Sequence, residues 1–159
     1  GNQMKAGRNP PSPSPLEAHL GFWLRFVSNH VSISFQRLLE AKGVTVTEWV
    51  ALRTLWAQDE TTHAELIQAL CMTKGAASKV VSRLVEKALA KQQLADGRVR
   101  EQYKVSTPAG KALVPQLAAL ADANDDHFFG HLPPAQRKAL MKAMQALVQY
   151  HQLKDIPTS

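Results

Sequence analysis

Two short helical segments that nearly meet in the sequence constrain the fold of this chain more than any other feature. The first covers "HAELIQAL", and Thr73 opens the second, which is predicted to run to about Ala88. Only Cys71 and Met72 separate the first segment from this cap. Two short helices joined by so tight a connection are typical of a helix-turn-helix.

The second of these helices has two unlike faces at helical spacing. The face expected to pack against the rest of the protein carries Ala77, Val81, Leu84 and Ala88. The opposite face is polar and basic and carries Lys74, Ser78, Lys79, Ser82 and Arg83. Lys and Arg on an exposed helix neutralise DNA phosphates, Arg also pairs with guanine, and small Ser side chains permit close approach. We therefore expect this face, together with Thr73, to bind DNA.

A β-hairpin is predicted directly after the helix-turn-helix. Asp96 and Gly97 favour a two-residue type I′ turn, which would pair Leu94 with Val99 across the strands. Residues 102–106 then alternate polar and apolar side chains, as a half-buried strand does. A helix-turn-helix followed by a two-stranded ribbon is a winged helix, so the predicted fold class is mainly α with a small β-hairpin wing.

The segment before the helix-turn-helix is predicted to hold two helices. Residues 16–41 place apolar side chains at helical spacing, and Gly43 is the expected stop. The next helix begins at a capping box formed by Thr45 and Glu48, a device that Thr62 repeats at the start of the following helix.

Two further helices are predicted after the wing. Thr107 and Pro108 begin one that ends at Gly130, and Pro115 inside it is expected to kink this helix or to delay its start. The other follows a pair of prolines and runs to about Leu153. Together with the first helix, these helices carry more apolar surface than a monomer of this length needs, which predicts a dimer interface.

The predicted organisation has four parts. A Pro/Ser-rich arm, flexible or bound to a partner, covers residues 1–15, and a dimerisation helix covers residues 16–44. The winged helix-turn-helix occupies residues 45–107, and C-terminal dimerisation helices occupy residues 108–159.

The net charge of +6 is concentrated in one segment of the chain. Lys and Arg number six against six Asp and Glu in residues 1–71 and four against four in residues 112–159, but nine against three in residues 72–111. Segregation of this kind indicates a polyanionic partner rather than a surface charged only for solubility.

Several classes of protein are disfavoured by the sequence. No apolar run is long enough to span a bilayer and no signal peptide is evident, so a cytoplasmic protein without a membrane partner is expected. Cys71 is the only cysteine, which excludes an intrachain disulfide and a cysteine-rich zinc site. A glycine-rich phosphate loop, a nucleophile elbow and a convincing metal triad are all missing from the sequence, so we expect neither an enzyme nor a cofactor.

At this point the chain resembles the MarR family of bacterial transcriptional regulators, over residues 16–153. The resemblance rests on the order and spacing of "TVTEWVALRTLW", "THAELIQALCMTKGAASKVVSRLVEKALA" and "DGRVREQYKVSTPAG". It implies a triangular homodimer whose terminal helices intertwine and whose winged helices bind a pseudo-palindromic operator in double-stranded DNA. It also implies that the recognition helix enters the major groove. Arg98, held by Asp96, would enter the minor groove, with Arg100 as a second candidate.

The chain departs from the family pattern at two positions. Ala88 stands after the recognition helix where the family usually has glycine, and alanine is strained at a positive φ, which leaves the conformation of the helix exit open. Ser106 stands just before "TPAG", where the family tends to have an apolar residue, and this leaves the register of the second wing strand open.

Aromatic side chains form a candidate ligand site. The family often binds phenolic or aromatic effectors between the dimer helices and the winged helix, whereas helical spacing alone favours packing in the core. The candidate residues are Phe22, Trp23, Phe26, His30, Trp49 and Trp56.

Three other residues are candidate sensors. His127 and His131 have the spacing of a metal chelate, but a helix break at Gly130 argues against one, and no metal site is expected. Cys71 lies in the turn of the helix-turn-helix and is expected to be a small buried residue rather than a redox switch.

The sequence therefore predicts a dimeric, sequence-specific DNA-binding transcriptional regulator. The resemblance implies a repressor that a small aromatic effector releases from DNA. The alternative is a winged helix used for protein interaction or dimerisation without specific DNA binding, which predicts a wing without DNA-facing charge. The three basic residues at positions 98, 100 and 104 favour DNA.

Overall fold

The computed structural model describes residues 11–95 and 98–153, with side chains for all of these except residues 95–102. The described chain is mainly helical with one small antiparallel sheet, which confirms the predicted fold class. A 3-10 turn at Leu16–Ala18 precedes the first helix. The elements are α1 (Leu20–Glu40), α2 (Val46–Ala57), β1 (Thr61–Thr62), α3 (His63–Leu70), α4 (Lys74–Glu86), β2 (Ala90–Ala95), β3 (Arg98–Ser106), α5 (Pro108–Phe129) and α6 (Pro134–Tyr150). Within the described ranges, every helix is too short or too polar to cross a membrane.

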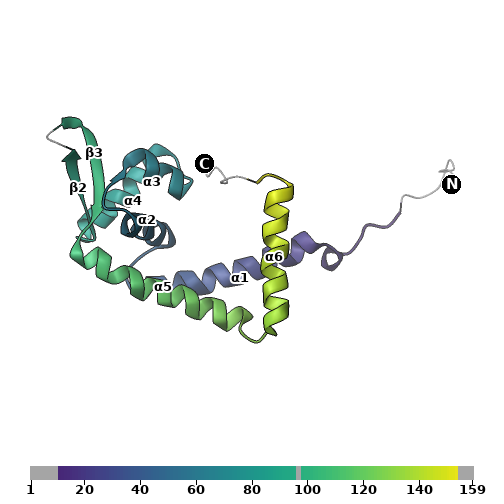
Figure 1. Cartoon of the computed structure of the whole chain (residues 1–159). Helices are drawn as coiled ribbons and strands as arrows, with labels where there is room; N and C mark the ends of the chain where they lie inside the picture. Colours follow the sequence, from purple (N-terminus) through teal and green to yellow (C-terminus); the bar gives the residue numbers. More distant parts are fainter. Residues whose placement is uncertain (1–10, 96–97, 154–159) are drawn as a thin grey trace, which may run out of the picture.

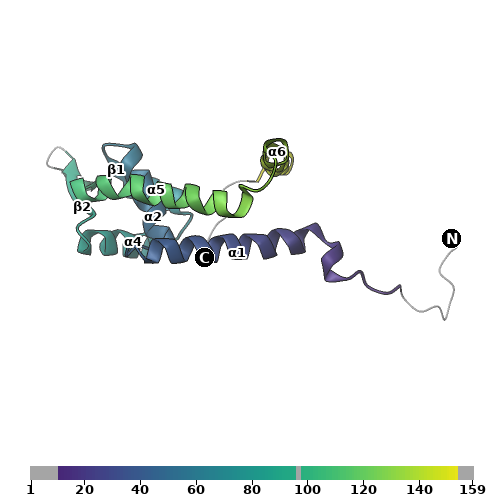
Figure 2. The same ribbon diagram turned by 90° about the horizontal axis from the view of Figure 1, so that it is seen from below.

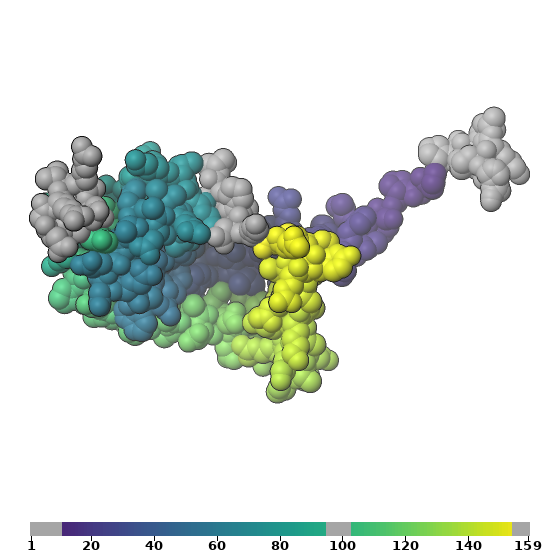
Figure 3. All heavy atoms as spheres, turned by 45° about the horizontal axis from the view of Figure 1, so that its top comes forward, coloured from purple at the N-terminus to yellow at the C-terminus, as the bar shows by residue number. Residues whose placement is uncertain are grey.

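The elements form a lobe and an arm. Figure 1 shows the wing, α2, α3 and α4 gathered above one end of α5, while α6 stands at the opposite end and crosses the line of α1. Seen from below, α1 and α5 run side by side as the base of the molecule (Figure 2), and they pack against each other. The space-filling view shows α6 projecting from this base as a separate arm (Figure 3). The core lies in the lobe and includes the fully buried Leu39, Leu52, Leu66, Leu84 and Leu117.

The predicted stop at Gly43 and the predicted starts of α2 and α3 are confirmed, whereas α1 begins at Leu20, four residues after the predicted start. Gly43 has a φ of 78°, a left-handed conformation that glycine adopts without strain. Thr45 and Glu48 form the capping box of α2, with the Glu48 amide donating to Thr45 Oγ1 at 3.1 Å and the Thr45 amide donating to Glu48 Oε1 at 2.7 Å. Thr62 forms the same box at α3. These local devices place α2 and α3 before any long-range contact is considered.

The helix-turn-helix is formed by α3 and α4. Thr73 caps α4 by accepting a hydrogen bond from the Ala76 amide at 3.2 Å. Three residues of the predicted apolar face are buried as expected, and Val80 joins them: Ala77, Val80, Val81 and Leu84. Ala88 is the exception, because α4 ends at Glu86 and Ala88 is exposed beyond it.

The exit of α4 keeps the conformation for which glycine is favoured. Ala88 has a φ of 60°, and the Leu89 amide donates to Leu84 O at 2.9 Å, which closes a Schellman-type turn. The Thr107 hydroxyl donates to Ala88 O at 2.7 Å and ties the exit to the start of α5. Alanine in place of the usual glycine therefore adds backbone strain at position 88, but the helix exit keeps the same conformation.

The wing is a three-stranded sheet in the order β1-β3-β2, with a strand that the sequence did not reveal. Ala95 pairs with Arg98 around the predicted turn, but Leu94 pairs with Gln102. The predicted pairing of Leu94 with Val99 is wrong, because β3 shifts register immediately after the first pair. The sequence of a turn specifies only the residue pair that closes the turn, so it does not predict a register shift further along the strands.

Strand β3 lies at the centre of this sheet and α2, α3 and α5 all contact it. Lys104, Val105 and Ser106 are consecutive buried residues, so the simple alternation predicted for this strand is wrong in its second half. Ser106 pairs with Ala90, and its buried hydroxyl has no hydrogen-bond partner within the described residues. Ser106 thus keeps its place in the sheet, but its hydroxyl is left without a hydrogen bond, which is unfavourable.

Helix α5 begins where the sequence predicts. Thr107 accepts a hydrogen bond from the Gly110 amide at 3.1 Å, and Pro108 is the first helical residue. The expected delay at Pro115 is wrong, because the helix has already begun and its ribbon continues without a break to Phe129 (Figure 1). Gly110 packs so closely against the Leu89 carbonyl that a side chain has no room there.

Candidate nucleic-acid interface

The polar face of α4 is presented to solvent as one surface. Lys74, Lys79, Ser82 and Arg83 are exposed, and Ser78 is half-buried. A shallow depression of about 330 Å³ on this face is lined by Ser78, Lys79, Ser82, Arg83 and Glu86. The structure therefore brings together the residues that the helical pattern grouped, because the opposite side of the same helix is fixed in the core.

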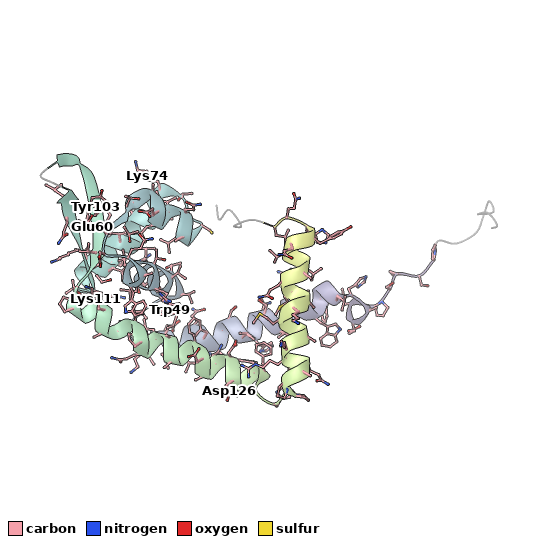
Figure 4. The ribbon with its side chains drawn as sticks, in the orientation of Figure 1. Trp49, Glu60, Lys74, Tyr103, Lys111 and Asp126 are labelled. Atoms are coloured by element: carbon pink, nitrogen blue, oxygen red, sulfur yellow. The ribbon has the colours of Figure 1, made fainter. Side chains whose placement is uncertain are left out.

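The N-terminal end of α4 and the wing point to the same side of the molecule. Figure 4 shows Lys74 at the top of the lobe, level with the upper part of the β2–β3 ribbon, while Lys111 lies at the foot of the wing. The backbones of Arg98 and Arg100 belong to β3, but their side chains lie outside the described residues, and so does the whole of Asp96. The predicted contact between Asp96 and Arg98 stays a prediction.

Two of the nine basic residues in the charged segment turn away from this surface. Lys87 Nζ lies 2.9 Å from Glu48 Oε1 and donates to Gly43 O at 2.7 Å, so its charge is paired inside the lobe. Lys104 is only 5% exposed and donates to Gln92 Oε1 at 3.2 Å. The segregation of charge counted along the sequence therefore overstates the charge available to a polyanion.

The pairing of Glu48 shows in its titration. Complete burial of the side chain raises the pKa of the carboxyl, but hydrogen bonds from Lys87 and from the Thr45 amide outweigh it and hold the pKa below its ordinary value. Burial alone lowers the pKa of Lys104. Glu48 and Lys87 thus form an ion pair that joins the start of α2 to the exit of the recognition helix.

His63 is a residue that sequence analysis missed. It opens α3, and its Nε2 lies 3.2 Å from Ser78 Oγ on the exposed side of α4. Burial lowers the pKa of His63, and the positive charges of Lys104 and Lys74 lower it further, whereas a hydrogen bond with the Lys74 backbone acts in the opposite direction. Its partner is fifteen residues away and neither residue belongs to a motif, so only the packing of α3 against α4 reveals the contact.

A second concave feature lies at the other end of the molecule. A groove of about 630 Å³ opens between the first half of α1, the end of α5 and the start of α6. Its polar groups come from Ser28, Ser32 and His131. Its apolar lining includes Trp23, Leu24, Val27, Phe128, Leu140 and Met144.

The structure disperses the aromatic residues that were predicted as one ligand site. Only Trp23 lines the groove. Phe26 lies between Phe22 and His30 in a row along α1, with ring centroids 6.2 and 4.8 Å apart. On α2, Trp49 packs against the core and Trp56 carries the Arg53 guanidinium at 4.8 Å from its ring centroid. Helical spacing predicted that these residues lie on two helices, but it did not indicate which helix faces pack against each other.

The other candidate sensors have ordinary surroundings. Cys71 is half-buried rather than buried, and its thiol donates to Gln68 O at 3.5 Å. His127 is exposed on α5, whereas His131 lies beyond the helix end at Gly130. Across residues 11–95 and 98–153, no three His, Cys, Asp or Glu side chains gather as metal ligands would.

Comparison with known proteins agrees with this geometry. The sequence model described as "MarR family" matches residues 44–91, which span α2, α3, α4 and the start of β2. Members of this family are transcriptional regulators rather than enzymes, in agreement with the expectation from the sequence. No curated protein matches the chain in sequence.

Solved structures extend the likeness to most of the chain. BpsR of Bordetella bronchiseptica, whose DNA binding is regulated by 6-hydroxynicotinic acid, is 23% identical with a TM-score of 0.73, over 86% of this chain and 97% of BpsR. CouR of Rhodococcus jostii RHA1, solved with p-coumaroyl-CoA, is 20% identical with a TM-score of 0.72, over 85% and 95%. MarR of E. coli is 18% identical with a TM-score of 0.69, over 82% and 97%. Residues 44–91 of the chain thus match the MarR-family model, and most of the chain shares the fold of solved structures that include a MarR-family transcriptional regulator.

Proposed function

We propose that this protein is a dimeric, sequence-specific DNA-binding transcriptional regulator. The observation that carries the proposal is the face of α4, where Lys74, Lys79 and Arg83 stand exposed on a helix whose opposite side is buried. A rigidly held helix with exposed cations and small polar side chains fits the major groove of B-DNA. A winged helix used only for protein interaction would not require exposed basic residues on this face.

The wing supplies the second contact in this proposal. Arg98 enters the adjacent minor groove, Asp96 orients it, and Arg100 contacts the backbone or the groove beside it. Support comes from the resemblance, from the position of the wing beside α4 and from the affinity of narrow A/T-rich minor grooves for guanidinium groups.

Dimerisation completes the DNA-binding unit. No residue of α6 is buried within the described chain, and its Leu140, Met144 and Leu147 are 38%, 42% and 49% exposed. The first half of α1 is equally uncovered, with Leu20 83% and Leu24 50% exposed. A second copy would cover both surfaces. A twofold dimer would place the two α4 helices about 34 Å apart, so the operator is an inverted repeat.

Release by a small molecule is the regulatory part of the proposal. BpsR and CouR are associated with 6-hydroxynicotinic acid and p-coumaroyl-CoA, which both contain an aromatic ring. The groove beside Trp23 is apolar with a few polar groups, as sites for such ligands are. We propose that an aromatic effector acts there and that the regulator is a repressor. A protein with this role works where the DNA is, in the bacterial cytoplasm.

A salt-series titration with the duplex upstream of the protein's own gene tests the proposal. Wild type should bind this duplex far more tightly than a scrambled one. Lys79→Ala should reduce the slope of log K against log salt by about 1.8, because it removes two phosphate contacts per dimer at about 0.9 per contact. Arg98→Ala should weaken binding of the native duplex more than binding of the scrambled one, because it removes the minor-groove contact. Lys111→Ala is the matched control and should leave the slope unchanged, since Lys111 lies at the foot of the wing.

Equal binding of the native and scrambled duplexes, together with failure to select any sequence from a random pool, would contradict sequence-specific regulation. The winged helix would then be an interaction or dimerisation module. A change of slope in Lys111→Ala equal to that in Lys79→Ala would contradict the proposed docking through α4.

A further inference from the structure

The hydrogen bonds of Ser78 determine which group donates and which accepts in its contact with His63. Ser78 Oγ lies 2.9 Å from Lys74 O and 3.2 Å from His63 Nε2. The carbonyl can only accept, so the single hydroxyl proton of Ser78 is donated to Lys74 O. The second contact then requires His63 to donate, which places the imidazole proton on Nε2.

The buried second nitrogen of His63 supports the same assignment. Nδ1 is buried and has no hydrogen-bond partner within the described residues. The opposite tautomer would leave a buried N–H there without an acceptor, which costs more than an unshared lone pair does.

Burial favours the neutral ring, because it lowers the pKa of His63. The cations Lys104 from β3 and Lys74 from α4 act in the same direction, against a hydrogen bond with the Lys74 backbone that favours the charged ring. A proton added at Nδ1 would be buried, unpaired and repelled by both lysines. The arrangement of donor and acceptor at Ser78 is therefore fixed near neutral pH.

We propose that Lys74 O and His63 together make Ser78 an acceptor-only contact, so that the recognition helix favours base pairs oriented with an exocyclic amine toward it. This inference rests on the proposed function and specifies its chemistry at one residue. The Ser78 proton points back to Lys74 O and one lone pair receives His63, which leaves one lone pair for DNA. In the major groove, adenine N6 and cytosine N4 are donors, whereas guanine N7 and O6 and thymine O4 only accept. Ser78 thus favours adenine or cytosine and disfavours guanine, thymine and phosphate.

His63 is a positioning residue in this scheme, because it acts on DNA only through Ser78. Ser82 is a matched comparison on the same face of α4, one turn further along and exposed. A serine hydroxyl whose proton is not taken by a carbonyl and whose lone pair is not filled by a donor both donates and accepts, and it accommodates any base edge. The serine beside His63 therefore carries more sequence information than its neighbour.

The tautomer can be measured in the free protein. Nitrogen-15 NMR of the imidazole near neutral pH should show a protonated Nε2 and a bare Nδ1, and the Nε2 signal should shift in Ser78→Ala. A ring protonated at Nδ1, or charged at this pH, would overturn the inference without affecting the proposed function.

Selection from a random pool of inverted-repeat duplexes tests the consequence for DNA. Wild type should prefer adenine or cytosine at one symmetric position, by about three- to tenfold, as expected for a single neutral hydrogen bond. Ser78→Ala should lose this preference alone. His63→Leu should weaken it, because Ser78 Oγ loses the donor that fixes its position, and His63→Gln, whose amide can donate to Ser78, should restore it. Ser82→Ala should leave this position unchanged.

Three outcomes would contradict the inference. Identical base preferences in wild type and Ser78→Ala would mean that Ser78 reads no base. Loss of a guanine or thymine preference in Ser78→Ala would mean that Ser78 donates. A uniform loss of affinity in His63→Leu without a change of preference would reduce His63 to a structural role. If wild type selects no sequence at all, the proposed function fails, and this inference fails with it.

Discussion

Leu84 in the lobe and Leu147 in the arm occupy similar places in amphipathic helices, yet one is completely buried and the other is 49% exposed. The difference lies in what surrounds them. Leu84 meets the core formed by α1, α2, α3 and α5, whereas α6 has no buried residue in the described chain. An amphipathic pattern predicts that a face will be covered, but the covering partner is a property of the assembly.

The same comparison separates two kinds of stability. The lobe holds a closed core and an ion pair whose carboxylate is buried, and it should resist unfolding by itself. The arm and the first half of α1 depend on a second copy, so their stability should depend on protein concentration. Four sets of substitutions sharpen or break this contrast.

Truncation of a leucine in each region gives the largest expected difference. Leu84→Ala should lower the free energy of unfolding by about 3 to 4 kcal/mol, because it removes fully buried atoms and leaves a cavity. The loss should be the same at every protein concentration. Leu147→Ala should weaken dimerisation in sedimentation experiments and lower the Tm mainly of dilute samples. An equal loss at all concentrations in Leu147→Ala would show that α6 is covered by its own chain.

Removal of Lys87 tests the ion pair inside the lobe. Lys87→Ala leaves the fully buried Glu48 carboxylate without its cation and should cost about 3 kcal/mol near neutral pH, measured by urea unfolding. Lys91→Ala, an exposed lysine of β2, is the control and should cost less than about 0.5 kcal/mol.

The pH dependence of this pair has a definite sign. The pKa of Glu48 is held below its ordinary value of 4.5, so the pair contributes fully above that pH. Its contribution is lost as the pH falls through the lower pKa of the folded state. The difference between wild type and Lys87→Ala should therefore shrink in acid. A constant difference down to about pH 3 would contradict the role of the ionised pair.

Gly110→Ala tests the contact between α5 and the exit of α4. The added methyl group would collide with the Leu89 carbonyl, which is backbone and cannot rotate away, so stability should fall by about 2 kcal/mol. Gly75→Ala places a methyl group in open space on α4 and should not lower stability. Equal effects of the two substitutions in thermal unfolding would show that the close approach is relaxed in solution.

Ala88→Gly has the smallest expected effect, and its sign is reversed. Alanine at a φ of 60° is strained, so glycine should raise stability by about 1 kcal/mol, less the entropy that glycine loses on folding. A decrease in Tm would indicate that the exposed exit relaxes around alanine without strain.

Local chemistry was predictable from the sequence wherever a few neighbouring residues decide the outcome. The capping boxes at Thr45 and Thr62, the cap at Thr107 and the stop at Gly43 were all confirmed, because each involves groups within three or four residues. The grouping of Lys74, Ser78, Lys79, Ser82 and Arg83 on one face followed from helical geometry alone.

Prediction failed where distant residues meet. The strand register beyond Ala95, the inward turn of Lys87 and Lys104, and the dispersal of the aromatic residues all depend on contacts across the fold. The delay expected at Pro115 does not occur, because the cap at Thr107 starts α5 upstream of the proline and the helix continues through it.

The sequence by itself determined the helices, their caps, the winged-helix order and the outward basic face, since short-range hydrogen bonds and periodicity specify these features. Only the tertiary structure decided that Lys87 neutralises Glu48, that Lys104 is buried in the wing sheet, and that His63 reaches Ser78. The physical reason is that burial and pairing depend on which surfaces meet. Residues far apart along the chain acquire those neighbours only when the helices pack.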